Sequence, residues 1–305
     1  MSSQSQIANR KSKVRAFTLF ELLIATAVIG LILASVVPFI MATREANRRV
    51  ACAANLAVLR DALNAYVKDH KSYPRVRYDA AVRPEGYVAF TGADDANPFA
   101  ADSKVEPSDV SAALWLLVRG DYVKDTSVFI CPSSNDSADR LYDGKGAAVT
   151  AKQRGNFRSG HNLSYSVFCM YGSAVKDFWS DTLQSGCALM ADKNPGIGDG
   201  DDVTKVATSQ PAEAYAITNS RNHGRGIQNV LYADGSVQQE RTPYVGVGYN
   251  RSAAGFKNGD NIYTALSAKP LPAGTEPPAD GQGVAGKNVS PAWPYDSYLV
   301  PTAQD

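Results

Sequence analysis

Histidine is scarce in this sequence. Only three occur in 305 residues, too far apart in the chain to form a short metal-binding motif. The chain also lacks the Gly-x-Ser-x-Gly pattern that exposes a serine nucleophile, and none of its four cysteines lies in an activating sequence context. Because no nucleophile–base pair is recognisable, we predict that the protein is not an enzyme.

Net charge is almost absent as well, since 31 basic and 30 acidic residues give a formal value of +1. No cluster of basic and aromatic residues stands out, so we expect no nucleic-acid partner. Residues 1–16, however, hold four basic residues and no acidic one. This leaves 27 basic and 30 acidic residues, a formal charge of −3, in the rest of the chain. The asymmetry indicates a targeting segment at the N-terminus.

A run of 25 residues from Phe17 to Met41 contains a single charge, Glu21. As a helix rising about 1.5 Å per residue, it can cross a hydrocarbon core of about 30 Å. The basic residues before it are expected to stay in the cytoplasm. We therefore predict a single-pass protein of the inner (cytoplasmic) membrane with its head on the periplasmic or extracellular side. A cleaved signal peptide would have a shorter apolar core followed by a small-residue cleavage site, and an uncleaved anchor leaves Glu21 without a function.

The stretch AFTLFELLIATAVIG, which begins at Ala16, resembles the prepilin signature of type IV pilins and type II secretion pseudopilins. The resemblance implies that a prepilin peptidase cuts between Ala16 and Phe17 and methylates the new amino terminus. Glu21 then becomes the acidic residue at the fifth position of the mature chain, and Pro38 falls where many of these helices carry a kinking proline. The departure from the family is Ala16, because the family usually has glycine before the cut.

A carboxylate within a membrane segment is costly and therefore indicates a function. We expect Glu21 to pair with the α-ammonium group of Phe17 on a neighbouring subunit, because the pair would offset the desolvation cost of both charges and set the axial register of a filament. The expected partners are other pilin or pseudopilin subunits, the prepilin peptidase, the secretion or pilus assembly machinery and the membrane.

Beyond the apolar run, the apolar residues recur at three- and four-residue steps, which predicts an amphipathic continuation of the helix. We expect this stripe to pack on a globular head. Its members are Ala46, Val50, Ala53, Leu56, Leu59, Leu63, Tyr66 and Val67. The predicted division of the chain is a leader over 1–16, a membrane segment over 17–41, the amphipathic continuation over 42–72, a head over 73–266 and a Pro-rich tail over 267–305.

A long helix followed by strand-like runs predicts an α+β fold, in which the N-terminal helix packs on a small antiparallel sheet. A second, shorter helix is expected over 107–123, with Ser108 or Asp109 as its cap. The runs with strand-like patterns are 127–134, 162–172 and 187–192.

The clearest local signal lies at 226–242, where two β-prone runs flank Asp234-Gly235, a dipeptide suited to a tight hairpin turn. Together with CAANLAVLRDALNAYVKDHKSYP, FICPSS and ALMADKNP, the stretch NHGRGIQNVLYADGSV is similar to a group of pseudopilin-like proteins with a C-terminal His-to-Asp-Gly motif, here His223 to Asp234-Gly235. The resemblance implies a pseudopilin head but no settled biochemical activity. Three roles are open for His223: a structural bond across the hairpin loop, metal binding, or catalysis.

An acidic, glycine-containing loop follows the run at 187–192. Its carboxylates offer hard oxygen ligands of the kind that Ca²⁺ prefers, although the order of an EF-hand and its closing glutamate are missing. The calcium loop of type II secretion major pseudopilins supports the same interpretation by resemblance, and a solvated Asp/Gly turn is the alternative. The candidate ligands are Asp192, Asp199, Asp201 and Asp202. No other cofactor is expected.

An even number of cysteines is compatible with two disulfides if the head is exported, and free buried thiols are the alternative. Our preferred pairing joins Cys52 on the long helix to Cys131, and Cys169 to Cys187 between neighbouring strands.

Seven prolines in residues 267–305 predict an extended tail or strap. Docking of this segment on the head through Trp293, Tyr295 and Tyr298 is the alternative. For the chain as a whole we predict a pseudopilin-like filament subunit of type II secretion or type IV pilus-like assembly. The alternative is a membrane-tethered extracytoplasmic binding module that does not polymerise.

Overall fold

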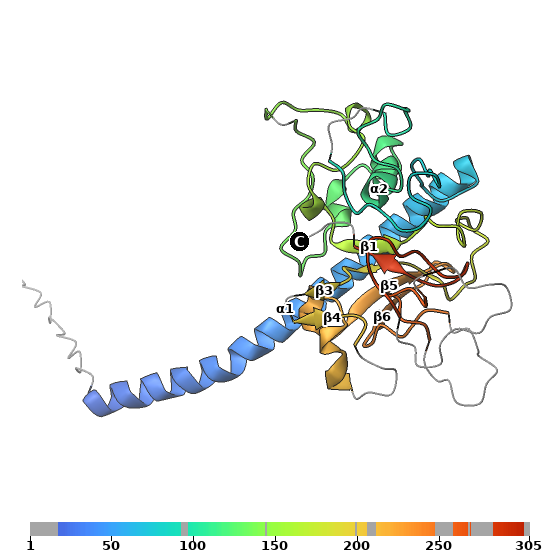
Figure 1. Ribbon diagram of the computed structural model, residues 1–305. Coiled ribbons are helices and arrows are strands. Elements are labelled where there is room, and N and C mark those ends of the chain that lie inside the picture. Colours follow the sequence, from blue (N-terminus) through green and yellow to red (C-terminus); the bar gives the residue numbers. More distant parts are fainter. Residues whose placement is uncertain are drawn as a thin grey trace, which may run out of the picture. The chain divides into compact units, whose positions relative to one another are not determined.

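One helix, α1 (Leu19–His70), supplies the N-terminal part of the structure (Figure 1). The computed structural model describes residues 18–92, 97–143, 145–198, 200–205, 212–247, 259–267, 269 and 283–301. The chain divides into two compact units, Met1–Ala46 and Asn47–Asp305. The long helix and a five-stranded antiparallel sheet confirm the predicted α+β class.

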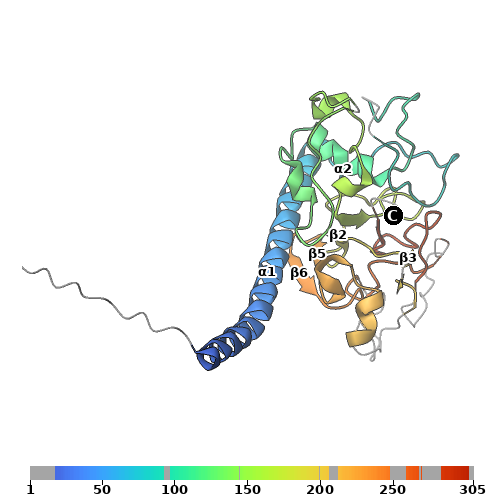
Figure 2. The same ribbon diagram turned by 90° about the vertical axis from the view of Figure 1, so that its left-hand side faces the viewer.

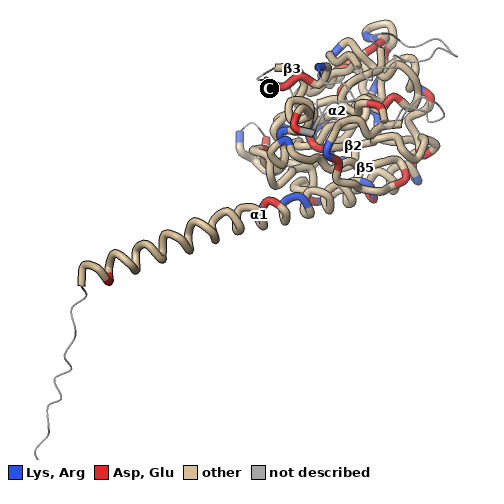
Figure 3. Tube along the Cα trace, turned by 90° about the horizontal axis from the view of Figure 1, so that it is seen from below, with Lys and Arg blue, Asp and Glu red and all other residues tan. Residues whose placement is uncertain are grey.

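In the first unit, α1 is long and apolar enough to cross a membrane, and none of its apolar window is buried. No Lys, Arg, Asp or Glu occurs on it between Glu21 and Arg44, as Figure 3 shows. The helix continues through Pro38. The bend that this proline is expected to cause stays a prediction.

In the second unit, α1 becomes amphipathic, and Figure 2 shows this half of the helix beside β5 and β6. The predicted stripe is confirmed from Leu56 onward, whereas Ala46 and Val50 are exposed and the first fully buried residue of α1 is Cys52. Each fully buried leucine of the stripe contributes about 1.5–3 kcal/mol. The buried residues of α1 are Cys52, Leu56, Leu59, Ala62, Leu63, Tyr66 and Val67.

The main sheet has the strand order β6-β5-β2-β1-β7, with every neighbouring pair antiparallel. The three central strands are buried along their whole length, whereas edge strand β6 is partly exposed. The polar residues of these strands, such as Gln228 and Asn229 of β5, are therefore buried together with the apolar ones. The strands are β1 (Tyr165–Phe168), β2 (Ala188–Asp192), β5 (Gln228–Tyr232), β6 (Val237–Glu240) and β7 (Leu299–Val300), and a separate pair is β3 (Ile197–Gly198) with β4 (Asp201–Asp202).

The predicted hairpin is confirmed as β5–β6. Gly235 closes its turn by donating its N–H to the carbonyl of Tyr232, and it has a φ of 83°. Asp234 shapes the same turn, because its side chain accepts a hydrogen bond from the N–H of Ser236.

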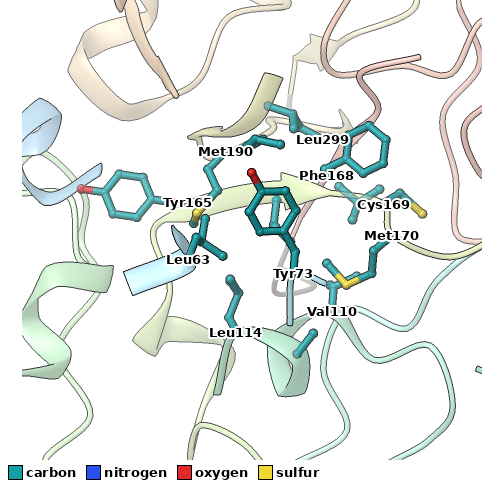
Figure 4. Packing of buried hydrophobic residues seen from close by; sticks show 14 of the residues in the cluster. Leu63, Tyr73, Val110, Leu114, Tyr165, Phe168, Cys169, Met170, Met190 and Leu299 are labelled. Carbon is teal, nitrogen blue, oxygen red and sulfur yellow. The ribbon is translucent and has the colours of Figure 1, made fainter. Parts of the chain in front are cut away.

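The second α-helix is α2 (Val110–Arg119), within the predicted range. Asp109 is its N-cap, and its side chain accepts the N–H of Ala112 at 2.8 Å. Figure 4 shows Leu114 of this helix in the same buried cluster as Leu63 of α1 and Met190 of β2. The core of the head therefore joins both α-helices to the sheet.

The strand predicted over 127–134 is absent, and the 3₁₀ helix η1 (Thr126–Phe129) lies there instead. Phe129 and Cys131 are buried, and Ile130 between them is partly exposed. Such an alternation is typical of a strand. Asp125 caps the 3₁₀ turn by accepting the N–H of Ser127. This local bond replaces the pairing that the sheet does not offer.

The predicted Pro-rich tail is part of the head over residues 283–301. Its strand β7 extends the sheet by pairing with β1, and Tyr298, Leu299 and Val300 are buried. The docking alternative is therefore correct for this segment. Residues 270–282, with four of the seven prolines, lie outside the described residues. The other short helices are η2 (Ala151–Gln153), η3 (Gly160–Asn162), η4 (Ala212–Ile217) and η5 (Asn222–Arg225).

Candidate functional site

The N-terminal end of α1 is closed by a reciprocal pair of hydrogen bonds. Glu21 Oε2 accepts from the backbone N–H and the hydroxyl of Thr18, each at 2.9 Å, and Thr18 Oγ1 accepts the N–H of Glu21 at 3.2 Å. This arrangement is a capping box, which satisfies donors that a helix start leaves unpaired. Glu21 therefore has a role within its own chain. The predicted processing residues Ala16 and Phe17 lie outside the described residues.

In the interior of the head, four side chains with metal-binding atoms lie together: Cys52, Cys131, Asp192 and His223. They are referred to below as the Cys-His-Asp cluster. Their ligand atoms all lie within 4.8 Å of one another, and among the described residues they form the one group of three or more His, Cys, Asp or Glu that could hold a metal ion. All four are buried.

Each member of the Cys-His-Asp cluster comes from a different segment. Cys52 lies on α1, Cys131 follows η1, Asp192 ends β2, and His223 lies in η5. Cys52 Sγ donates to Asp192 Oδ1 at 3.1 Å. His223 Nε2 lies 3.4 Å from Cys131 Sγ and 3.6 Å from Asp192 Oδ2.

The two thiols of this cluster differ in acidity. The hydrogen bond with Cys52 lowers the pKa of Cys131 to about 7, against the effect of burial, and the hydrogen bond with His223 acts in the same direction. Burial, followed by the hydrogen bond with Cys131, raises the pKa of Cys52. The site thus stabilises the thiolate form at Cys131, which is the form that acts as a nucleophile or binds metals.

Neighbouring amides hold the carboxylate of Asp192 in place. Asn222 Nδ2 donates to its Oδ1 at 3.1 Å, and the backbone N–H of Asn229 donates to its Oδ2 at 2.7 Å. On the opposite side, Asn55 of α1 donates to the carbonyl of Ile130, one residue before Cys131, at 2.9 Å. These bonds, donated from other segments, fix the carboxylate of Asp192 and the backbone next to Cys131.

His223 is held in an unusual backbone conformation, with a φ of 57° followed by a φ of 67° at Gly224. A left-handed conformation at a residue other than glycine costs about 1–3 kcal/mol and occurs often at functional sites. Here it directs Nε2 toward Cys131 and Asn229. Asp234 instead bonds within the hairpin turn. His223 thus contacts Asn229 on the first strand of the hairpin at 3.3 Å, and its predicted structural bond across the hairpin loop stays a prediction.

Neither predicted disulfide is present, because all four cysteines are free. Cys52 and Cys131 do meet, as the prediction required, but as members of the Cys-His-Asp cluster. Cys169 Sγ instead lies 3.5 Å from the carbonyl oxygen of Tyr171, and Cys187 Sγ accepts from Ser297 Oγ at 3.7 Å. The predicted Cys169–Cys187 disulfide was therefore wrong. Cys169, which follows β1, and Cys187, which precedes β2, each contact a different partner.

The candidate calcium ligands have separate partners. Asp192 belongs to the Cys-His-Asp cluster, whereas the buried carboxylate of Asp201 faces the guanidinium groups of Arg221 and Arg225 at 2.5 and 2.9 Å. Two adjacent cations disfavour Ca²⁺ at Asp201. Asp202 forms an ion pair with Lys205. Asp199 lies outside the described residues, and calcium binding by this loop stays a prediction.

Sequence reasoning singled out all four members of the cluster, but for three different purposes. Two were assigned to a disulfide, one to calcium and one to a hairpin motif. Their positions in the chain, 52, 131, 192 and 223, have no short spacing that indicates a common site. The supporting residues Asn222 and Asn229 were not predicted, because amide side chains carry no motif of their own.

Comparison with known proteins bears on the N-terminal segment. Residues 11–37 match the family described as prokaryotic N-terminal methylation motif. No curated protein and no solved structure matches the chain. The match supports the resemblance to type IV prepilins and pseudopilins. It implies processing by a prepilin peptidase and assembly with other pilin-type subunits, and with the apolar part of α1 it supports single-pass anchoring in the inner membrane.

Proposed function

We propose that this chain, a prepilin-like protein by its N-terminal methylation motif, is a pseudopilin-like subunit of a type II secretion or type IV pilus-like filament. The supporting observation is Glu21, the single charge in the apolar run of α1, none of whose apolar window is buried. A bare apolar helix requires lipid or neighbouring helices around it. The carboxylate, in turn, requires a cation of its own.

The capping box leaves Glu21 able to meet a second partner. Both bonds from Thr18 reach the same oxygen, Oε2, and neither uses Oε1. A carboxylate offers about four acceptor positions on its two oxygens. In the proposed filament, Oε1 accepts from the methylated α-ammonium of Phe17 on the neighbouring subunit after cleavage beside Ala16. The capping box meanwhile keeps the carboxylate in one orientation.

Replacement of Glu21 separates its two roles. Glu21→Gln keeps an oxygen for the capping box but removes the charge, whereas Thr18→Ala removes the capping hydroxyl and keeps the charge. We expect Glu21→Gln to insert into the membrane normally but to enter sheared filaments about tenfold less, because a loss of about 1.4 kcal/mol per contact changes an equilibrium tenfold. Thr18→Ala should enter sheared filaments in an amount close to that of the natural protein.

The measurement is quantitative immunoblotting of sheared filaments against the membrane fraction, with mass spectrometry of the mature N-terminus to establish methyl-Phe17. Normal filament entry of Glu21→Gln and of Glu21→Val would rule out the ion pair. A chain that is processed but never found in sheared filaments would instead favour a membrane-tethered binding module.

A further inference from the structure

The Cys-His-Asp cluster has the size of a tetrahedral metal site. Bonds of about 2.0–2.3 Å from Zn²⁺ to oxygen, nitrogen and sulfur place the ligand atoms about 3.3–3.8 Å apart. Three of the six separations between its ligand atoms are 3.1 Å for Cys52 to Asp192, 3.4 Å for Cys131 to His223 and 3.6 Å for His223 to Asp192, and all six lie within 4.8 Å. A small inward or outward adjustment of each side chain therefore makes room for one ion.

Hydrogen bonding alone does not account for the surroundings of His223. Its Nε2 lies within 3.6 Å of the Cys131 sulfur, the Asn229 amide nitrogen and the Asp192 carboxylate. An imidazole nitrogen carries either one hydrogen or one lone pair, so it bonds well to only one of these groups. A metal ion uses the lone pair of this nitrogen and attracts the sulfur and the carboxylate at the same time.

We propose that the Cys-His-Asp cluster binds one Zn²⁺. Two thiolates and one imidazole favour zinc over the hard cations Ca²⁺ and Mg²⁺, which bind oxygen ligands. Binding releases the two thiol protons to solvent, and the carboxylate of Asp192 completes four protein ligands. The side-chain amide of Asn222 and the backbone N–H of Asn229 orient that carboxylate, as outer-shell partners of metal ligands do.

The proposed centre is structural. Four protein ligands leave no open position for a substrate, and catalytic zinc sites keep one. The side chains of His223 and Asp192 are fully buried, which excludes solvent. Because the ligands span residues 52 to 223, the ion would join the head-side half of α1 to three distant segments of the head. It would thus take the place of the predicted Cys52–Cys131 disulfide.

The first test measures zinc in the full-length protein, purified in detergent without chelators. We expect about one Zn²⁺ per chain, lost in Cys131→Ser and in His223→Gln. The matched controls are Cys169→Ser and Cys187→Ser, which remove equally buried thiols outside the cluster and should keep the metal. Asn222→Ala, which removes the side-chain donor to Asp192 Oδ1, should bind zinc about 10–100-fold more weakly in competition with a chromophoric chelator.

The second test uses the natural sequence only, in case a variant does not fold. Stripped protein titrated with Co²⁺ should develop the visible bands of tetrahedral cobalt and a thiolate charge-transfer band, and Zn²⁺ should abolish both. Chelation should lower the melting temperature and Zn²⁺ should restore it. Protein that binds neither ion, or folded protein in which peptide mapping finds a Cys52–Cys131 disulfide, would overturn the proposal. Neither result depends on filament assembly.

Discussion

A buried arginine illustrates how local bonds control charge inside the head. The guanidinium of Arg154 forms a two-point ion pair with Asp139 and lies 4.5 Å from the centre of the Trp115 ring. Burial acts to raise the pKa of Asp139, but hydrogen bonds from Arg154 and from the backbone N–H of Arg158 outweigh it. The pKa of Asp139 therefore lies below its ordinary value, and the pair is ionised at neutral pH.

Asp139→Asn should lower the free energy of unfolding by about 3–5 kcal/mol, because it leaves the buried charge of Arg154 uncompensated. Asp121→Asn is the control. It breaks an ion pair with Lys152 whose side chains are 71% and 68% exposed, and it should change stability by no more than about 0.5 kcal/mol. Denaturant unfolding of the full-length protein in detergent measures both, and a similar small change in the two variants would contradict the expectation.

The capping role of Glu21 was readable from the sequence. Thr18 and Glu21 have the three-residue spacing of a capping box directly before an apolar run. The prediction concentrated on the cost of the charge and omitted this local bond. In the proposed filament the same carboxylate would serve both roles, since the capping box uses only its Oε2.

Among the secondary-structure elements, those with a local cause agree best with prediction. The β5–β6 hairpin depends on Asp234-Gly235, and α2 depends on the cap at Asp109. The predicted strand at 127–134 failed because alternation of buried side chains does not supply a pairing partner. Whether such a segment joins a sheet depends on a neighbouring strand with free hydrogen-bonding groups.

Gly235→Ala should destabilise the protein by about 1–2 kcal/mol, because a side chain at positive φ is strained. An added Cβ would also lie 3.0 Å from the Cδ atom of Arg60. Gly226→Ala is the control, since Gly226 has a φ of −87° and its added Cβ would meet nothing closer than 4.0 Å. Melting temperatures of the two variants measure the difference, and equal losses would show that conformation at the turn is not the cause.

For the head as a whole, the C-terminal segment is held by a pair of buried acids. Asp296 accepts the backbone N–H groups of Leu266 and Ala292, and Asp260 accepts that of Ser297. Burial raises the pKa of Asp296 to about 7. Burial, and then the charge of Asp296, raises the pKa of Asp260 well above its ordinary value. The folded protein therefore retains protons that the unfolded chain releases.

Stability should consequently fall as pH rises. An unfolded aspartate has a pKa of about 3.9, so the stabilising contribution of protonated Asp296 is complete below about pH 4 and is lost as pH rises through about 7. Within this window, each proton that only the folded protein retains makes the free energy of unfolding fall by at most about 1.4 kcal/mol for each unit that the pH rises.

Asp296→Asn tests this dependence, because the amide keeps an acceptor oxygen and removes the titrating proton. In unfolding experiments, the free energy of unfolding of the variant should rise relative to that of the natural protein as pH increases from 4 to 7. Exposed Glu106→Gln should leave the slope unchanged. A pH slope that is the same in Asp296→Asn and in the natural protein would refute the assignment.

Features that depend on neighbouring residues could be predicted from the sequence: the membrane-length helix with its lone charge, the amphipathic stripe from Leu56 onward, the hairpin and, through these elements, the α+β class. Each follows from a spacing of a few residues, which a linear pattern records directly. The C-terminal boundary of the head could not be predicted from such local spacings. Strand β7 is two residues long, too short for any periodicity, and it became visible only through its pairing with β1.

Nothing in the order of the chain relates Cys52, Cys131, Asp192 and His223, and it is the folded head that brings them together. Their meeting depends on the packing of α1 against the sheet and on the return of the chain through η1 and η5. Such contacts join residues separated by up to 171 positions, and no local energy term favours them before the core has formed. The sequence thus supplied the four side chains, and the packed core placed them within 4.8 Å of one another.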